Sequence, residues 1–154
     1  MREDTSLDDT VLTLVNQCNA ARRGRNNGLA AQQAFAAEQA LESSFRCSQQ
    51  LAVYGTLAPG ESNHHLLANC PGTWCTATVL GRRTVRHFPA FTYDATASPV
   101  PVHLLTSTRL PGHWRDLDAF EGPDYRRILV PVRLESQRFT IANLYEAALL
   151  VPPA

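Results

Sequence analysis

A loop with two glycines is the first place where this sequence could do chemistry. In "VYGTLAPGES", residues 53–62, Gly55 and Gly60 are spaced as in a phosphate-binding loop, but Glu61 stands where that loop carries its lysine. A carboxylate at that position repels phosphate, whereas the glycines still let backbone N–H groups approach an anion closely. The loop therefore favours a carboxylate-bearing ligand over a phosphate, unless it is an ordinary tight turn.

Three carboxylates near the end of a predicted helix, residues 110–122, form the second candidate group: Asp116, Asp118 and Glu121. We expect the two aspartates to be solvated, because the C-terminal end of a helix is the negative end of its dipole. Glu121 precedes a Gly-Pro stop, and a sheltered corner there would raise its pKa from about 4.3 towards the range of about 6–7 that suits a general acid or base. The alternative is a plain carboxylate at a helix end.

The composition of the chain excludes several classes of function. The chain has 154 residues and no net charge, since 14 basic residues balance 14 acidic ones, and every basic residue is an arginine. Neutrality gives no reason to expect nucleic-acid binding, and the lack of lysine excludes a catalytic lysine, a lysine Schiff base and a phosphate-loop lysine. A polar, acidic N-terminus and the lack of any apolar run of about 20 residues predict a soluble, cytoplasmic protein with no membrane partner.

The cysteines and histidines predict no metal site, because neither C-x-x-C nor His-x-x-x-His spacing occurs. The four scattered thiols are expected to be small buried side chains in a reducing compartment. A cysteine–histidine hydrolase built on Cys70 or Cys75 has no local support, and no G-x-S-x-G motif indicates a serine hydrolase.

The elements that must position these groups divide into a helical N-terminal extension, residues 1–48, and a domain over residues 49–154. Apolar residues at spacings of three and four predict one helix from Leu7 to Arg23, with Ser6 as its cap, and a second helix whose inner face runs from Ala30 to Phe45. Neither helix carries a reactive constellation. We expect them to pack onto the following domain or against another copy of the chain.

From residue 50 the pattern is that of short strands. We expect strands at 51–54, at 73–81 and 82–88 meeting at Gly81, at 88–94 and at 99–105, then the helix and two paired strands at 126–134 and 137–147. The fold class is α+β, a small mixed β-barrel or sheet with short helices.

Four segments taken together resemble the γ-glutamylcyclotransferase-like family. They are "YGTL", "FPAF", "LDAFEGPDYRR" and "IANLYE", in that order over residues 51 to about 147, and "GESNHHLL" is similar to bacterial members and the γ-glutamylamine branch. A departure lies at residues 100–106, "VPVHLLT", where members often carry Val-x-Gly-x-x-Tyr. The departure leaves one wall of the expected pocket undefined.

The resemblance implies a small barrel with a cavity at the mouth of its first strand, and an enzyme that cyclises a γ-glutamyl amine or peptide to 5-oxoproline without metal or cofactor. The implied acid/base is Glu121, and Arg127 would anchor the helix end. The alternative is a non-catalytic module that binds glutamate-like molecules, and the N-terminal helices could form a homo-oligomer. The implied substrate-binding residues are Tyr54, Gly55, Thr56, Leu57, His64, Tyr125 and Tyr145.

Overall fold

The computed structural model describes residues 8–24, 28–85 and 89–148. Two helices come first, α1 (Asp9–Arg22) and α2 (Gly28–Phe45), and a third, α3 (Trp114–Glu121), lies late in the chain. The strands are β1 (Gln50–Val53), β2 (Thr73–Val85), β3 (Pro89–Tyr93), β4 (Pro99–Thr106), β5 (Tyr125–Leu134) and β6 (Phe139–Ala147). Short 3₁₀ turns, η1 (Cys47–Gln49), η2 (His64–Leu67) and η3 (Leu110–Gly112), connect them.

Five of the strands close into a barrel in the order β2-β4-β1-β6-β5, with β5 pairing back onto β2, while β3 extends the sheet beyond β2. The barrel is mixed, because β1 and β6 run parallel and the other neighbours are antiparallel. Its interior is filled by side chains from one face of each strand, including Val79, Val102, Ile128 and Leu144. The expected α+β barrel with short helices is confirmed.

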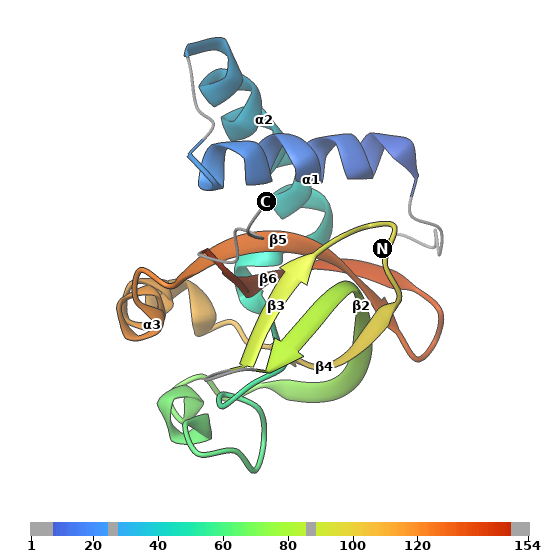
Figure 1. Cartoon of the computed structure of the whole chain (residues 1–154). Coiled ribbons are helices and arrows are strands. Elements are labelled where there is room, and N and C mark those ends of the chain that lie inside the picture. Colours follow the sequence, from blue (N-terminus) through green and yellow to red (C-terminus); the bar gives the residue numbers. More distant parts are fainter. Residues whose placement is uncertain (1–7, 25–27, 86–88, 149–154) are drawn as a thin grey trace.

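Helices α1 and α2 cross one another over the outside of β5 and β6 (Figure 1). Their inner faces meet the outer face of the barrel in one cluster that includes Val15, Leu41, Leu129 and Ile141. The helices therefore pack onto the barrel, the first of the two arrangements that the sequence allowed. Helix α1 is capped by Asp8, whose side chain accepts a hydrogen bond from the Val11 N–H at 2.9 Å; the predicted cap, Ser6, and Leu7 lie outside the described residues.

A buried asparagine joins α1 to the edge of β5. The amide of Asn19 donates to the Leu129 carbonyl at 2.7 Å, and its oxygen accepts from the Leu129 N–H at 2.8 Å. Strand β5 pairs with β2 only at Arg133 and Leu134, so its edge at Leu129 would otherwise carry unpaired backbone groups. Asn19 thus takes the place of a neighbouring strand.

Strand β2 is continuous through Gly81, where the sequence suggested two strands meeting. A Cβ at Gly81 would lie 2.1 Å from Cζ of Phe91 on β3, so the glycine makes room for that ring within an unbroken ladder. The prediction was wrong because glycine here provides space, which sequence alone does not distinguish from a chain reversal. Residues 86–88 of the second predicted strand lie outside the described residues.

Helix α3 packs on the outside of the barrel through Trp114 and Leu117. The indole N–H of Trp114 donates to the Ser48 carbonyl at 2.9 Å, which ties the helix to the turn before β1. Gly122 ends α3 with a φ of 74°, a left-handed conformation that favours glycine, and so fixes Glu121 as the last helical residue. In the described part of the chain, we find no helix that combines the length and apolar character needed to cross a membrane.

Candidate active site

A cavity of about 220 Å³ opens where β1 ends and the C-terminal end of α3 faces it. The end of β1 and its loop contribute one wall, α3 a second through Phe120 and Glu121, and strands β5 and β6 a third through Tyr125 and Tyr145. Every residue that the sequence suggested for the site lines this cavity except His64. The residues of the loop wall are Ala52, Val53, Tyr54, Gly55, Thr56 and Leu57.

The loop wall is braced from behind by residues that follow it in the chain. The side-chain amide of Asn63 donates to the Thr56 hydroxyl at 2.9 Å, and the Asn63 N–H donates to the Thr56 carbonyl at 2.8 Å. Nδ1 of His64 lies 2.9 Å from the Leu57 carbonyl oxygen, so this nitrogen carries the hydrogen. His64, which was expected to contact substrate, instead supports the loop, and its ring is tilted by 52° against that of Trp74, with ring centroids 5.2 Å apart.

Backbone donors remain available in this loop. The N–H groups of Gly55, Thr56 and Leu57 have no hydrogen-bond acceptor among the described residues. Gly60 has a φ of 83°, so one of the two glycines that suggested a phosphate loop does hold a left-handed turn. Consecutive free amides can hold a carboxylate or a developing oxyanion.

Glu121 contributes the cavity's only acidic side chain among its lining residues. Its carboxyl has no hydrogen-bond partner in the described structure, and burial raises its pKa from 4.5 to about 7. A carboxyl with this pKa exists in both protonation states near neutral pH, as a general acid and base requires.

Two tyrosines connect the loop wall to the strands. The Tyr54 hydroxyl donates to the Tyr145 carbonyl at 2.7 Å, and the Tyr145 hydroxyl donates to Oδ1 of Asp118 at 2.6 Å. Burial raises the pKa of both phenols, and nearby carboxylates raise them further. Both therefore stay neutral donors. Burial likewise raises the pKa of Tyr125, and Glu121 adds to the effect.

Asp118 has a structural role that sequence reasoning did not find. Nε and Nη2 of Arg127 donate to its two oxygens at 2.9 and 3.2 Å, while the guanidinium lies 4.5 Å over the Trp114 ring. Burial alone would raise the pKa of Asp118, but hydrogen bonds from Arg127 and Tyr145 outweigh it and lower the pKa overall. Arg127 anchors α3, as expected. The only signal in the sequence was that Asp118 and Arg127 have opposite charges. The turn between them does not reveal, from sequence alone, that the two side chains meet.

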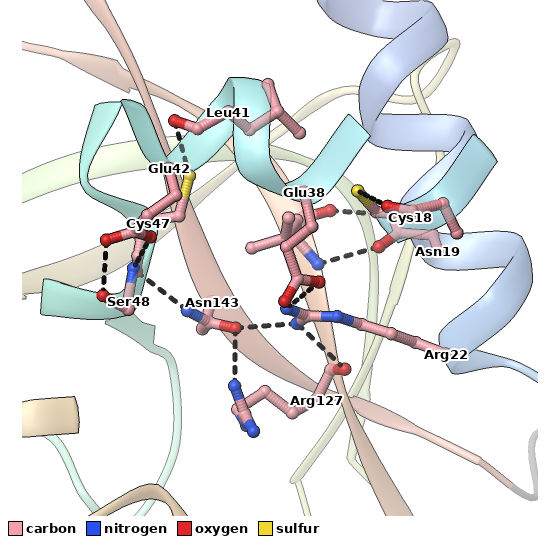
Figure 2. A network of polar contacts seen from close by, with 12 residues as sticks. Cys18, Asn19, Arg22, Glu38, Leu41, Glu42, Cys47, Ser48, Arg127 and Asn143 are labelled. Atoms are coloured by element: carbon pink, nitrogen blue, oxygen red, sulfur yellow. Dashed lines mark hydrogen bonds and ion pairs between the residues drawn. The ribbon is translucent and has the colours of Figure 1, made fainter. Parts of the chain in front are cut away.

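A second cavity, of about 420 Å³, adjoins the first and shares Tyr125 and Tyr145 with it. Arg22 of α1 and Arg127 of β5 both line it, and Figure 2 shows that both point at Asn143 of β6. Their Nη1 atoms donate to the same Asn143 oxygen at 2.8 and 3.1 Å. Asn143 is buried and donates in turn to the Cys47 carbonyl at 2.8 Å. Sequence reasoning assigned no role to this asparagine or to Arg22.

The remaining candidates lie away from both cavities. The segment 100–106 belongs to β4, and within the described chain no β4 residue lines the first cavity, so the missing family glycine leaves its wall unaffected. Burial raises the pKa of the Cys70 and Cys75 thiols, and neither is among the described residues that line these two cavities, which argues against a thiolate nucleophile. The described residues contain no cluster of three or more possible metal ligands.

The site in the described part of the chain is therefore a cavity on a closed mixed barrel, lined by a carboxyl without a hydrogen-bond partner and by loop residues whose backbone N–H groups are free. Residues 51–152 match the family described as gamma-glutamyl cyclotransferase, AIG2-like. The chain belongs to this family, and its two N-terminal helices lie outside the matched region. No curated protein matches the chain.

Several solved structures are similar in fold to the barrel of this chain. YkqA from Bacillus subtilis is 27% identical with a TM-score of 0.53, over 64% of this chain and 35% of that protein, so the chain spans about a third of its length. An AIG2-like protein from Mus musculus is 20% identical with a TM-score of 0.53, over 68% of this chain and 80% of that one. An Arabidopsis thaliana protein solved in solution is 18% identical with a TM-score of 0.54, over 68% and 65% of the two chains. The last two likenesses concern the fold alone.

Proposed function

We propose that this chain is an enzyme that cyclises a γ-glutamyl amine or γ-glutamyl peptide to 5-oxoproline and releases the amine, with Glu121 as general acid and base. The observation that carries the proposal is the pairing of one carboxyl, of pKa about 7 and without a hydrogen-bond partner, with unpaired loop amides in the same cavity. Membership of the family supports the reaction class.

In this proposal the loop amides at Gly55, Thr56 and Leu57 receive the γ-glutamyl group. Their N–H groups suit its α-carboxylate and the oxyanion that develops on the γ-carbonyl. Tyr54, Tyr125 and Tyr145 surround the aliphatic part of the substrate, and Leu57 adds apolar contact. The volume of about 220 Å³ suits a group of glutamyl size and leaves the rest of a substrate outside it.

The reaction needs little beyond folding the substrate on itself. The α-nitrogen attacks the γ-carbonyl carbon, a C–N bond closes the five-membered lactam, and the bond from that carbon to the departing nitrogen breaks. The α-ammonium loses two protons in all, and the departing nitrogen gains two. Holding both reacting atoms in one bound molecule supplies much of the rate. Glu121 accepts a proton from the ammonium and returns one to the leaving amine.

The test is release of 5-oxoproline from a panel of γ-glutamyl compounds by wild type and by Glu121→Gln. We expect turnover by the wild type and a loss of at least about a hundredfold in kcat/KM in the variant, the usual size of a general acid/base contribution. Asp116→Asn, an exposed acid-to-amide change on the same helix, should retain activity. A panel on which wild type and Glu121→Gln are equally inactive, yet bind the compounds, would instead indicate a non-catalytic binding module.

Assembly through the N-terminal helices stays a prediction. Their inner faces are occupied by the barrel, and α2 leaves Leu29 and Phe35 exposed, at 68% and 69%. Sedimentation of wild type and of a Leu29→Asp, Phe35→Asp double variant measures whether these side chains hold copies together. Equal masses for the two proteins at the monomer value would reject the homo-oligomer.

A further inference from the structure

Glu146 is a buried carboxylate to which the proposed reaction assigns no role. It lies on β6 with 2% of its side chain exposed, and it is not among the described residues that line the two cavities. Nε and Nη2 of Arg23 donate to its two oxygens at 3.0 and 2.8 Å. A carboxylate taken out of water needs such a hydrogen-bonded cation. The cation comes from the C-cap of α1, in the N-terminal extension.

Arg23 is the arginine that fixes this carboxylate in place. Arg126 lies opposite Glu146 in the β5–β6 ladder, but its Nε is 3.6 Å from Oε2, which is too long for a hydrogen bond. That Nε is buried and has no hydrogen-bond acceptor in the described structure. The planar guanidinium of Arg23, in contrast, meets both oxygens at once, a geometry that an ammonium group does not reproduce.

The same carboxylate links β6 to β3. Oε1 of Glu146 accepts a hydrogen bond from the Tyr93 N–H, at the end of β3, at 3.2 Å. Strand β3 pairs with β2, and in the described ranges no backbone ladder joins it to β6, although the two strands pack against each other. A side chain from β6 therefore supplies a polar connection that the sheet itself does not.

Tyr54 of the candidate active site touches both of these strands. Its hydroxyl donates at 2.7 Å to the carbonyl of Tyr145, the residue before Glu146 on β6. Its ring lies 5.4 Å from that of Phe91 on β3. The place of the Tyr54 side chain thus depends on how β6 and β3 are held relative to each other.

We propose that Arg23 is a positioning residue for the candidate active site. Through Glu146 it holds the ends of β6 and β3 together, and so places Tyr54 in the wall of the first cavity. Arg23 lies outside the family-matched region, which begins at residue 51, so the N-terminal extension completes a site that the barrel otherwise provides. The effect on turnover rests on the proposed function, whereas the placement of Tyr54 does not.

The placement of Tyr54 can be measured without a substrate. Because the chain has four tyrosines, protein with isotopically labelled tyrosine Cζ gives four NMR signals, and Tyr54→Phe identifies the one that matters. We expect Arg23→Gln to shift this signal, since the ends of the two strands are no longer held. Arg23→Lys should shift it less, because a lysine keeps the charge without the two-pronged contact. Arg83→Gln removes an exposed arginine of β2 and should leave the signal unchanged.

A kinetic test asks whether Arg23 acts through Tyr54. With γ-glutamyl-alanine as substrate, we expect Arg23→Gln to lower kcat/KM for 5-oxoproline release by about tenfold or more, as for a displaced substrate-positioning group. Adding Arg23→Gln to Tyr54→Phe should lower kcat/KM no further, because two residues in one chain of contacts have non-additive effects. A general loss of stability would instead add to the effect of Tyr54→Phe.

An unchanged Tyr54 signal or an unchanged kcat/KM in Arg23→Gln would overturn the inference. An equal signal shift in Arg83→Gln, or full additivity with Tyr54→Phe, would do the same. If Arg23→Gln fails to fold, Arg23→Lys is measured in both tests and judged by the same criteria. If the wild type releases no 5-oxoproline from γ-glutamyl-alanine, the proposed function fails for that compound, and the Tyr54 signal alone decides the role of Arg23.

Discussion

Asp118 and Glu121 lie three residues apart on α3, yet their carboxyl groups have opposite electrostatic settings. Arg127 and Tyr145 hydrogen-bond to Asp118 and lower its pKa overall, whereas burial without a partner raises the pKa of Glu121 to about 7. One carboxylate is thus fixed as an anion that holds the helix, and the other is left able to exchange protons. Neighbours in sequence take different roles because only one of them meets an arginine.

The pH dependence of the proposed reaction should follow Glu121. The carboxylate form is the base that starts the reaction, so kcat/KM should rise with pH through a midpoint near 7. Initial rates of 5-oxoproline release between pH 5 and 8 measure it. A midpoint near the ordinary pKa of a glutamate would contradict the raised pKa of Glu121.

The free energy of unfolding should also depend on the ionisation of Glu121. It should fall as the pH rises, whereas kcat/KM should increase. Because its folded pKa is raised from 4.5 to about 7, the native state binds more protons than the unfolded state between these values. Stability associated with this group is present below about pH 4.5 and is lost as the pH rises through about 7, by about 3 kcal/mol at most. Denaturant unfolding of wild type and Glu121→Gln at pH 5 and pH 8 should show the variant relatively more stable at pH 8. Parallel curves for the two proteins would contradict the raised pKa.

Tyr145→Phe should weaken the attachment of α3. It removes the 2.6 Å hydrogen bond to Asp118 and leaves that carboxylate to Arg127 alone. We expect a loss of about 1–3 kcal/mol in the free energy of unfolding, as for a hydrogen bond to a charged group. Because Tyr145 also stabilises the ionised form, the pKa of Asp118 should rise, which NMR titration of the carboxyl carbon can follow. An unchanged titration of Asp118 would count against the bond.

Asn19→Ala should be far more destabilising than Asn16→Ala on the same helix. Asn19 satisfies both backbone groups of Leu129, and the change leaves them buried without partners. The expected cost is about 2–4 kcal/mol, whereas Asn16 is exposed and its loss should cost less than about 0.5 kcal/mol. Equal urea midpoints for the two variants would mean that α1 does not complete the edge of β5.

Gly81→Ala should disturb the site from a distance. The added methyl would meet Phe91, whose ring lies 5.4 Å from that of Tyr54. We expect a loss of about 1–3 kcal/mol from overpacking, together with a shift of Tyr54 that near-ultraviolet circular dichroism can detect. Gly112→Ala is the matched control, because a Cβ there meets nothing within 4 Å.

Local patterns predicted much of this architecture. The apolar spacing of α1 and α2, the short strands and the Gly-Pro stop after Glu121 all follow from which residues alternate and where turns interrupt them. The errors have local causes too. Gly81 was taken for a break because sequence does not tell glycine as a turn from glycine as space, and His64 was taken for a ligand because a histidine beside a loop does not reveal which face of the loop it joins.

The sequence by itself determined the elements, the loop of free amides and the position of Glu121 at a helix end, since each depends on neighbours within a few residues. Only the tertiary structure decided which charges meet. Arg127 and Asn143 lie on the paired strands β5 and β6, and the packing of α1 on the outside of these strands brings Arg22 to the same Asn143 oxygen. Contacts across more than a hundred residues of chain leave no periodic trace, so the second cavity, and the part that the extension has in it, emerge from packing alone.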